Sequence, residues 1–294
     1  MTAVDTPHPR RHGKLVGRVM VYGLLAVLAL AFLAPLITML LTSLKSMDEI
    51  RAGNLFSLPQ APTLDAWRKV WDAACIGVEC NGLKWHFAVS FLMVIPAVIL
   101  SVTLGALNGY VLTKWRFRGD NIVFAFILFG CFIPFQTVLI PMAYLLGALG
   151  IAGTIPGLVL VHVVYGISFT TLFFRNYFVS IPDEILRAAR IDGAGFWAIL
   201  LRILLPVSWP IIMVSVIWQF TGIWNDFLFG VAFSAGSGQP VTVALNNLVN
   251  TSTGTKAYDE DMAAAVITAL PTIAVYVMAG RYFVRGLMAG SVKG

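Results

Sequence analysis

The stretch "RVMVYGLLAVLALAFLAPLITMLLT", residues 18–42, contains no charged side chain after Arg18. A helix that crosses the hydrocarbon core of a bilayer needs about 20 predominantly apolar residues, because each residue rises about 1.5 Å and the core is about 30 Å thick. A cleaved targeting peptide is the alternative, but its apolar core would be only about 7 to 15 residues long. The stretch therefore predicts an uncleaved first membrane span.

The rest of the chain has the same apolar character. Of its 294 residues, 59% are hydrophobic and 12% are charged, whereas soluble domains carry about 25% charged residues. Further stretches long enough to cross a membrane run approximately over 86–113, 121–146, 154–174, 206–229 and 262–284. We therefore expect an all-α integral membrane protein with six transmembrane helices. Prolines inside these stretches predict kinks, which membrane helices tolerate: Pro35, Pro96, Pro134, Pro141 and Pro271.

The positions of Lys and Arg predict the orientation, because cytoplasmic loops carry an excess of them. Most of the 20 basic residues lie in the N-terminal tail, after the second span, within residues 175–205 and at the C-terminus. Both termini are therefore predicted to be cytoplasmic, with outer loops at 43–85 and 230–261. Residues 1–17 would form a tail and 18–294 one transmembrane domain. The net charge of +6 then reflects topology, and we expect no nucleic-acid partner.

The cysteines differ in their surroundings. Cys131 lies within a span, where a free thiol behaves as a small apolar side chain. Cys75 and Cys80 fall in the predicted outer loop, where an oxidising compartment permits a disulfide. A metal site is the less favoured alternative, because no second Cys/His pair accompanies them.

Motifs of enzymatic chemistry are missing from the sequence. It contains no G-x-x-x-x-G-K-[ST] phosphate loop, no H-E-x-x-H and no G-x-S-x-G. We therefore expect no catalytic residue, no metal and no cofactor bound by this chain. His162 lies inside a span, where it is either a proton relay or, as we favour, a hydrogen-bonded residue that packs helices.

A polar, interrupted segment, "EILRAARIDGAGFWAILLRILLPVSWP" at residues 184–210, separates the fourth and fifth predicted spans. Acidic residues that follow Pro182 predict a helix start, because they favour the positive end of the helix dipole. Gly193 predicts its end after about two turns, since Gly readily takes the left-handed conformation. Such a short helix with small side chains at Ala188 and Ala189 fits a cleft on a cytosolic partner. An amphipathic helix that lies on the membrane is the alternative.

The same segment resembles the cytoplasmic loop signature of binding-protein-dependent ABC importer permeases, in particular the carbohydrate branch typified by the smaller permease subunit of the maltose importer. The similar features are the alanine pair, Asp192-Gly193-Ala194, Leu205-Pro206 and Pro210. Further similar blocks are "TSLKSMDEI", "GYVLTKWRFRGD", "LIPMAYLLGALGIAGTIPGLVL", "WNDFLFG" and "RYFVRGLMAGSVKG". Two positions depart from the pattern, because the usual Glu before the alanine pair is Arg187 and a common Gln is Gly280.

The resemblance implies a permease subunit of an ATP-driven sugar importer in a prokaryotic inner membrane. It implies a homologous second permease, two cytosolic ATPase subunits that use ATP and Mg, and a periplasmic or extracellular sugar-binding protein. The expected ATPase-coupling residues are Glu184, Arg187, Ala188, Ala189, Asp192, Gly193 and Ala194. Arg187 would disturb an ion pair made by the family Glu, and Glu184 is a candidate to supply a nearby acid instead. The C-terminal "GLMAGSVKG" would also reach the ATPase.

Substrate contacts are expected where polar and aromatic residues interrupt the apolar spans, although Trp at a membrane interface is also a common anchor. The candidates for the sugar path are Gln136, Gln219, Trp224, Asn225 and Asp226, near Trp218. The loop "SAGSGQPVTVALNNLVNTSTGTKAYDED" resembles the segment that enters the binding protein, and its composition is typical of a mobile loop. The outer loop with its cysteine pair resembles those of monosaccharide importers, which implies glucose or mannose.

Two other functions remain open at this point. A self-contained secondary transporter would typically need internal repeats and charged residues buried in its spans, and the sequence shows neither. A membrane scaffold protein would use the short helix for docking and would have no transport path.

Overall fold

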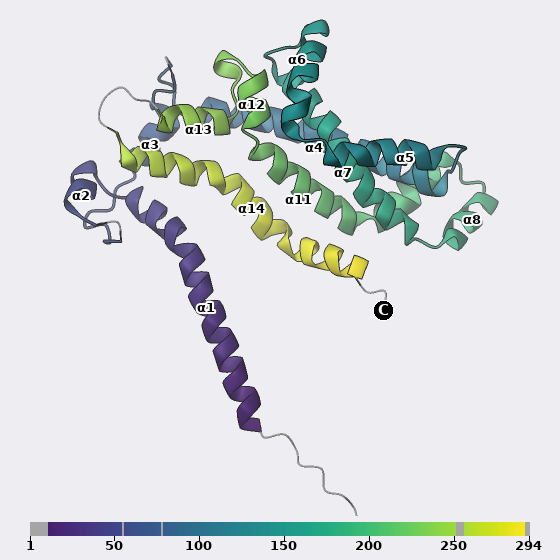
Figure 1. Ribbon diagram of the computed structural model, residues 1–294, viewed down its shortest axis with the longest axis horizontal. Helices are drawn as coiled ribbons and strands as arrows, with labels where there is room; N and C mark the ends of the chain where they lie inside the picture. The colour runs from purple at the N-terminus through teal and green to yellow at the C-terminus, as the bar shows by residue number, and fades with distance from the viewer. Residues whose placement is uncertain (1–10, 55, 78, 251–255, 292–294) are drawn as a thin grey trace, which may run out of the picture. The chain divides into compact units, whose positions relative to one another are not determined.

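The computed structural model describes residues 11–54, 56–77, 79–250 and 256–291, and within this part every regular element is helical. Two isolated β-bridges join Ile76 to Glu79 and Gly153 to Ser234. The predicted all-α class is therefore confirmed (Figure 1). Residues 1–10 of the predicted N-terminal tail and residues 292–294 at the end of "GLMAGSVKG" lie outside the described residues.

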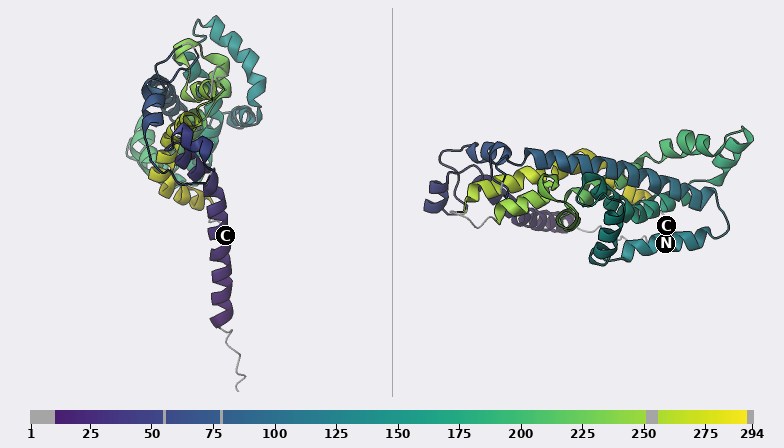
Figure 2. Two further views of the ribbon diagram at one scale, coloured as in Figure 1. Left: turned by 90° about the vertical axis from the view of Figure 1, so that its left-hand side faces the viewer. Right: turned by 90° about the horizontal axis from the view of Figure 1, so that it is seen from above.

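Among the residues that the structure describes, four helices are long and apolar enough to cross a membrane. Their membrane-length segments are Gly17–Thr42 in α1 (Arg11–Thr42), Lys84–Lys114 in α4, Ile155–Val179 in α7 and Tyr258–Gly280 in α14 (Tyr258–Ser291). The third and fifth predicted spans are each a bent pair of helices, with angles of 106° and 79°. Figure 2 shows the first of these bends where α5 and α6 meet. The number of spans reaches six if each bent pair crosses once.

The break in the third predicted span lies at a proline. Helix α5 (Asp120–Phe129) continues into η1 (Gly130–Phe132), and the chain resumes as η2 (Phe135–Val138) and α6 (Leu139–Ala148). Between them Pro134 has extended backbone, with φ −60° and ψ 140°, and it has no N–H to donate to a helix. The expected kink at Pro134 is thus a full interruption, whereas Pro35, Pro96 and Pro271 remain inside helices.

The bend in the fifth predicted span follows a short π-helix. The chain passes from α9 (Phe196–Ile199) through η3 (Leu200–Leu204) and α10 (Leu205–Val207) into α11 (Trp209–Trp224). Pro206 and Pro210 cannot donate backbone hydrogen bonds, which favours irregular helical geometry in this segment. The expected start of the span at residue 206 therefore falls at the bend.

The chain divides into two compact units. The first comprises Met1–Val70 with Gly254–Val266 and contains α1, α2 (Met47–Ala52) and the first turns of α14. The most apolar 18-residue window of the Gly17–Thr42 segment of α1 has a mean hydropathy of 2.7 and contains no buried residue, as expected for a helix surrounded by lipid or by another apolar chain. Just after the end of α1, the Lys45 side chain is buried and donates to Ser57 Oγ at 2.9 Å.

The second unit comprises Trp71–Thr253 with Ile267–Gly294, and the packing of α4 against α7 forms its frame. Small residues on α4 let the backbones approach closely, as in membrane helix pairs with a G-x-x-x-G spacing. A Cβ atom at Gly109 would lie 2.7 Å from Phe174 Cβ, and one at Gly105 would overlap Thr170. Thr170 Oγ1 also donates to Ser101 O at 2.9 Å across this contact.

The connections that the sequence analysis predicts to be outer loops hold more structure than expected. Cys75 and Cys80 are joined by a disulfide, and α3 (Asp65–Asp72) precedes them. The segment expected to be a mobile loop contains α13 (Val241–Val249), whose buried side chains are Val241, Val243 and Ala244. Val241 N donates to buried Ser90 Oγ on α4 at 2.8 Å. The expectation of a loop is therefore wrong for α13, because its Val residues provide an apolar face; residues 251–255 lie outside the described part.

Candidate functional site

The short helix expected between the fourth and fifth spans is present as α8 (Asp183–Ile191). Asp183 and Glu184 lie in its first turn, directly after Pro182, as predicted. Its C-terminus is a Schellman motif, because Ala194 N donates to Ala189 O at 2.9 Å and Gly193 N donates to Arg190 O at 3.1 Å. Gly193 therefore has a structural role, because it adopts φ +84°, a conformation that residues with a side chain rarely take.

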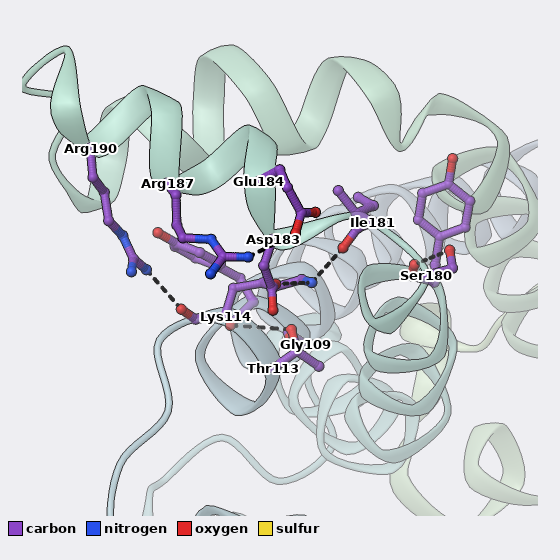
Figure 3. A network of polar contacts seen from close by, with 11 residues as sticks. Gly109, Thr113, Lys114, Ser180, Ile181, Asp183, Glu184, Arg187 and Arg190 are labelled. Atoms are coloured by element: carbon purple, nitrogen blue, oxygen red, sulfur yellow. Dashed lines mark hydrogen bonds and ion pairs between the residues drawn. The ribbon is translucent and has the colours of Figure 1, made fainter.

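Charged side chains fasten both ends of α8 to the end of α4 (Figure 3). At the first end, Lys114 Nζ donates to Asp183 Oδ1 and to Ile181 O, each at 2.6 Å. At the other end, Arg190 Nη2 donates to Lys114 O at 2.9 Å. The guanidinium of Arg190 also lies 5.2 Å from the centre of the Trp115 ring, within cation–π range. Lys114 thus takes part in both attachments.

The attachment affects the ionisation of Asp183. The hydrogen bond and charge of Lys114 hold the pKa of the Asp183 carboxyl below its usual value of 3.8. The carboxylate is two-thirds exposed while the Lys114 side chain is almost fully buried, with 67% and 6% exposed respectively. A buried ammonium needs such a partner, so the pair fixes where α8 begins.

Apolar packing supports the segment that follows α8. Tyr110 Oη donates to Phe196 O at 3.4 Å, and the two rings lie 4.7 Å apart. Leu186 is the buried residue of α8. The loop is therefore held against α4 along its length by polar and apolar contacts.

The outward face of α8 carries apolar, small and charged side chains. Ile191 is 87% exposed and Ile185 is 48% exposed, and Ala188 is exposed beside them. Arg187 Nη2 donates to Glu184 Oε1 at 2.7 Å, so the departure from the family pattern is paired within the helix itself. Ala189 is half-buried, so only part of the expected small face is free. The structure thus gathers all seven expected coupling residues on α8 and its C-terminal cap.

A second site is a cavity of about 340 Å³ in the same unit. It lies between α7 and α11, beside the interruption at Pro134 and the break between α11 and α12. The polar side chains that line it include His162, Gln219 and Asp226, and the rings include Tyr165, Phe169 and Trp218. Phe135 and Cys131 contribute from either side of the break at Pro134, and Phe229 contributes from α12 (Leu228–Phe233).

The expected sugar-path residues do not all meet at this cavity. Gln219 and Asp226 line it. Trp224 is fully buried and donates from Nε1 to Thr268 O at 3.0 Å, so it packs the helices. Asn225 is exposed and donates to Thr221 O on its own helix, and Gln136 is exposed on η2. Neither Asn225 nor Gln136 lines the cavity.

Residues that the sequence analysis missed follow a helical spacing. On α7 the missed lining residues Tyr165, Gly166 and Phe169 follow His162. On α11 and its extension, Gly222 and Ile223 lie between the expected residues Gln219 and Asp226, and Trp218 also lines the cavity. Both sets repeat at three, four and seven residues, which places each set on one helix face. This spacing is visible in the sequence. It does not mark one face as a site, however, because nearly all other residues of α7 and α11 are apolar.

The electrostatics of the cavity depend on a few groups. Asp226 Oδ2 accepts from Gly230 N at 3.1 Å at the start of α12. His162 Nε2 lies 3.8 Å from the same carboxylate oxygen and has no hydrogen-bond partner among the described residues. Gln219 Nε2 donates to Gly166 O at 2.9 Å. No group of three or more His, Cys, Asp or Glu side chains is placed to hold a metal ion within the described residues.

The chain is similar to membrane subunits of transport systems. The family model described as "Binding-protein-dependent transport system inner membrane component" matches residues 97–287. A probable ABC transporter permease of Pyrococcus horikoshii is 37% identical over 94% of this chain and 98% of that protein. The xylose/arabinose import permease of Haloferax volcanii is 32% identical over 92% of each chain. The diacetylchitobiose uptake permease of Streptomyces coelicolor is 30% identical over 92% of this chain and 88% of that protein.

The fold is also similar to a solved transporter chain. A crystal structure of a bacterial ABC transporter involved in the import of the acidic polysaccharide alginate matches with a TM-score of 0.79 and 24% identity, covering 95% of this chain and 100% of that one. The match to the family model includes α8 and the cavity-lining helices α7 and α11. Because that model covers more than half of the sequence, and the relatives align over nearly all of it, this chain belongs to the family of binding-protein-dependent transport system inner membrane components.

Proposed function

We propose that this chain is one permease subunit of an ATP-driven sugar importer, and that α8 docks on a cytosolic ATPase. Support comes from its family and from two relatives named as sugar permeases. The main structural support is the outward face of α8. Hydrogen bonds attach both ends of this helix to α4, and Ile185, Ala188 and Ile191 remain exposed. Exposed apolar side chains on a fixed element favour burial against another surface.

The assembly follows from this proposal. The chain pairs with a homologous permease, two cytosolic subunits hydrolyse ATP with Mg, and a periplasmic or extracellular binding protein delivers the sugar. Both bent pairs count as single spans, which gives six spans with cytoplasmic termini and places residues 175–205 inside. The outer loops 43–85 and 230–261 then face the binding protein, in a prokaryotic inner membrane. Gln219 and Asp226 lie on the solute path, and glucose or mannose is the proposed cargo.

Coupling in this scheme requires that α8 bind the ATPase with different affinity in its different states, because equal affinity shifts no equilibrium. The attachment through Lys114 links any movement of α8 to α4, and therefore to the helix frame. The C-terminal end of α14 is proposed to contact the ATPase as a second surface.

Cysteine cross-linking tests the proposal. Ala188→Cys is introduced into a Cys131→Ser background, and the assembly is treated with a bifunctional maleimide. We expect a product with the cytosolic ATPase whose yield changes when ATP is added. The matched control is Ala61→Cys, an alanine that is also exposed and lies in the predicted outer loop, which should give no such product. Equal yields from both positions, or a product with lipid-reactive probes alone, would support a membrane-surface helix instead.

Uptake measurements separate the other two functions. Proteoliposomes that contain the whole assembly are given radiolabelled D-glucose or D-mannose, with and without internal ATP. Uptake that needs both the ATPase subunits and ATP supports the importer. Uptake without ATP would favour a secondary transporter, and a cross-linked complex that moves neither sugar nor a broader panel would favour a scaffold.

A further inference from the structure

We infer that a groove beside the C-terminal end of α1 binds one glycerophospholipid, with an acyl chain along α1 and the phosphate at Lys256 and Tyr258. The groove lies wholly within the first compact unit, and residues of α1, of α2 and its connection, and of the first turns of α14 line it. The inference goes beyond the transport role, because the lipid is a resident ligand and not the cargo. It takes only the membrane orientation of α1 from the proposed function.

The shape and chemistry of the groove suit a hydrocarbon chain. Ala34, Thr38 and Thr42 line it at four-residue spacing, so they share one face of α1. At about 1.5 Å per residue they extend over about 12 Å, a length comparable to much of an acyl chain. The lining is almost wholly apolar, and the Thr38 hydroxyl donates to Ala34 O at 2.9 Å within the helix. The volume of about 570 Å³ falls within the range of ligand sites, about 300 to 1,000 Å³.

Polar contacts hold the walls of the groove in place. Trp67 Nε1 on α3 donates to Ser43 Oγ, directly after α1, at 3.2 Å. Lys69 on the same helix forms an ion pair with Glu260 in the first turn of α14 at 2.5 Å. Helix α3 therefore links the wall formed by α1 to the wall formed by α14. The groove is a feature of the folded unit that exists before a ligand binds.

The groove lies at one end of the membrane-length segment Gly17–Thr42. With a cytoplasmic N-terminus, residues 34–42 of α1 lie in the outer leaflet. The polar stretch "KSMDEI" at residues 45–50 follows directly, and it lies at the level of the headgroups. An acyl chain in the groove therefore has its headgroup beside α2 and the start of α14.

Two side chains at the start of α14 suit a phosphate. Tyr258 lines the groove, is exposed, and its hydroxyl has no hydrogen-bond partner among the described residues. Lys256 Nζ lies 5.7 Å from the centre of the Tyr258 ring. It also lies 3.8 Å from Asp261 Oδ2, and its side chain is 48% exposed, so donors of this ammonium remain free. A phosphate diester accepts hydrogen bonds from both an ammonium and a phenol hydroxyl.

The charges nearby limit the headgroup. In the first turn of α14, Glu260 is paired with Lys69 and Asp261 with Lys256, which leaves Asp259 as the acid without a cation among the described residues. An unpaired carboxylate repels added negative charge. The site therefore favours a lipid with one phosphate diester over lipids that carry several negative charges.

A second protein chain is the other occupant that an apolar groove could take. The opposite face of α1 suits that role better, because the large side chains of Leu33, Leu36 and Leu40 are exposed there as a row. The groove instead combines a recessed apolar channel with a cation and a free hydroxyl at its end. This combination fits a flexible chain that carries a phosphate.

Photolabelling of the purified complete assembly tests the inference. The probes are a phosphatidylglycerol with a diazirine near the end of one acyl chain and the matching diacylglycerol, which lacks the phosphate. Labelled peptides are identified by mass spectrometry. We expect saturable labelling within residues 34–42 or 258–262, at a concentration about fivefold lower for the phosphatidylglycerol, because a basic residue near an anionic headgroup contributes about this factor.

Two variants with matched controls separate the acyl chain from the phosphate. Thr38→Phe places a ring in the groove and should reduce labelling by both probes about fivefold or more. Ile37→Phe, at the neighbouring exposed position outside the groove, should label as wild type. If Thr38→Phe fails to fold, Lys256→Met still tests the site, because it should reduce phosphatidylglycerol labelling to that of the diacylglycerol. Its control is Lys84→Met, a lysine that is 51% exposed, is also ion-paired and does not line the groove.

Three results would overturn the inference. The first is equal labelling by both probes in the wild-type assembly, and the second is groove labelling that neither Thr38→Phe nor Lys256→Met reduces. The third is an unlabelled groove from which Met39→Cys cross-links to the homologous permease, which would assign the groove to a protein contact. All three leave ATP-dependent uptake and α8 cross-linking intact, whereas failure of the proposed function abolishes both and leaves lipid labelling unchanged.

Discussion

Helix α8 and the cavity between α7 and α11 differ in what each leaves unsatisfied. On α8 the charged side chains are paired, through Lys114 with Asp183 and through Glu184 with Arg187, while large apolar side chains such as Ile191 are exposed. In the cavity the aromatic rings pack against one another, while the buried His162 Nε2 lacks a hydrogen-bond partner among the described residues. The first pattern favours burial against a large apolar surface, whereas the second leaves a polar atom unpaired inside the protein.

The largest effect, a loss of folded protein, is expected from a change that disrupts both α8 and the cavity. Helix α4 holds α8 at its end, and α4 packs on α7, which lines the cavity. Gly109→Val would place side-chain atoms within 3 Å of the Phe174 backbone and Cβ, and overpacking of this kind costs about 1 to 3 kcal/mol or more. We expect little monodisperse protein from membranes by size-exclusion chromatography. Gly147→Val on α6, where a Cβ meets nothing within 4 Å, is the control. Equal yields would show that the α4–α7 contact is not the common frame.

A change that loosens α8 and leaves the cavity intact separates the roles of the two sites. Lys114→Met removes the donor to Asp183 and Ile181 O while keeping most of the buried aliphatic stem. We expect normal yield and hexose binding, but about tenfold less ATP-dependent uptake and less Ala188→Cys cross-linking, because a bond to a charged group is worth about 1.5 to 3 kcal/mol.

The control for Lys114→Met is Lys84→Met at the other end of α4, whose exposed pair with Asp72 joins nothing to α8. It should retain wild-type uptake, because exposed ion pairs contribute little. The idea that Lys114 positions α8 would be contradicted by a Lys114→Met assembly that transports normally. Loss of hexose binding together with uptake would instead mean that the two sites are not separable.

The sequence predicts α8 well and the cavity poorly, for a physical reason. The start at Pro182 and the end at Gly193 are set by local backbone chemistry, which a sequence displays directly. The attachment to Lys114 joins residues 69 positions apart, and nothing in the sequence pairs them. The cavity depends on Pro134 breaking its span where Pro96 does not break another, and this outcome is decided by the tertiary surroundings.

The smallest expected effect on uptake comes from the pair formed by Glu184 and Arg187, the Arg that stands where the resemblance to the family implies a Glu. Glu184 and Arg187 form an exposed pair three residues apart, and such pairs stabilise a helix by only about 0.2 to 0.5 kcal/mol. Glu184→Ala leaves Arg187 without its intrahelical partner at the surface proposed to dock. We expect ATP-dependent uptake to fall about twofold in Glu184→Ala and to recover in the double variant Glu184→Ala/Arg187→Ala, because the unpaired cation is then gone. A deeper loss that the double variant does not restore would mean that Glu184 itself contacts the ATPase, since a double-mutant cycle separates a shared effect from an independent one. Either result assigns the acid on α8 to one role: neutralising Arg187 within the helix or binding the partner directly.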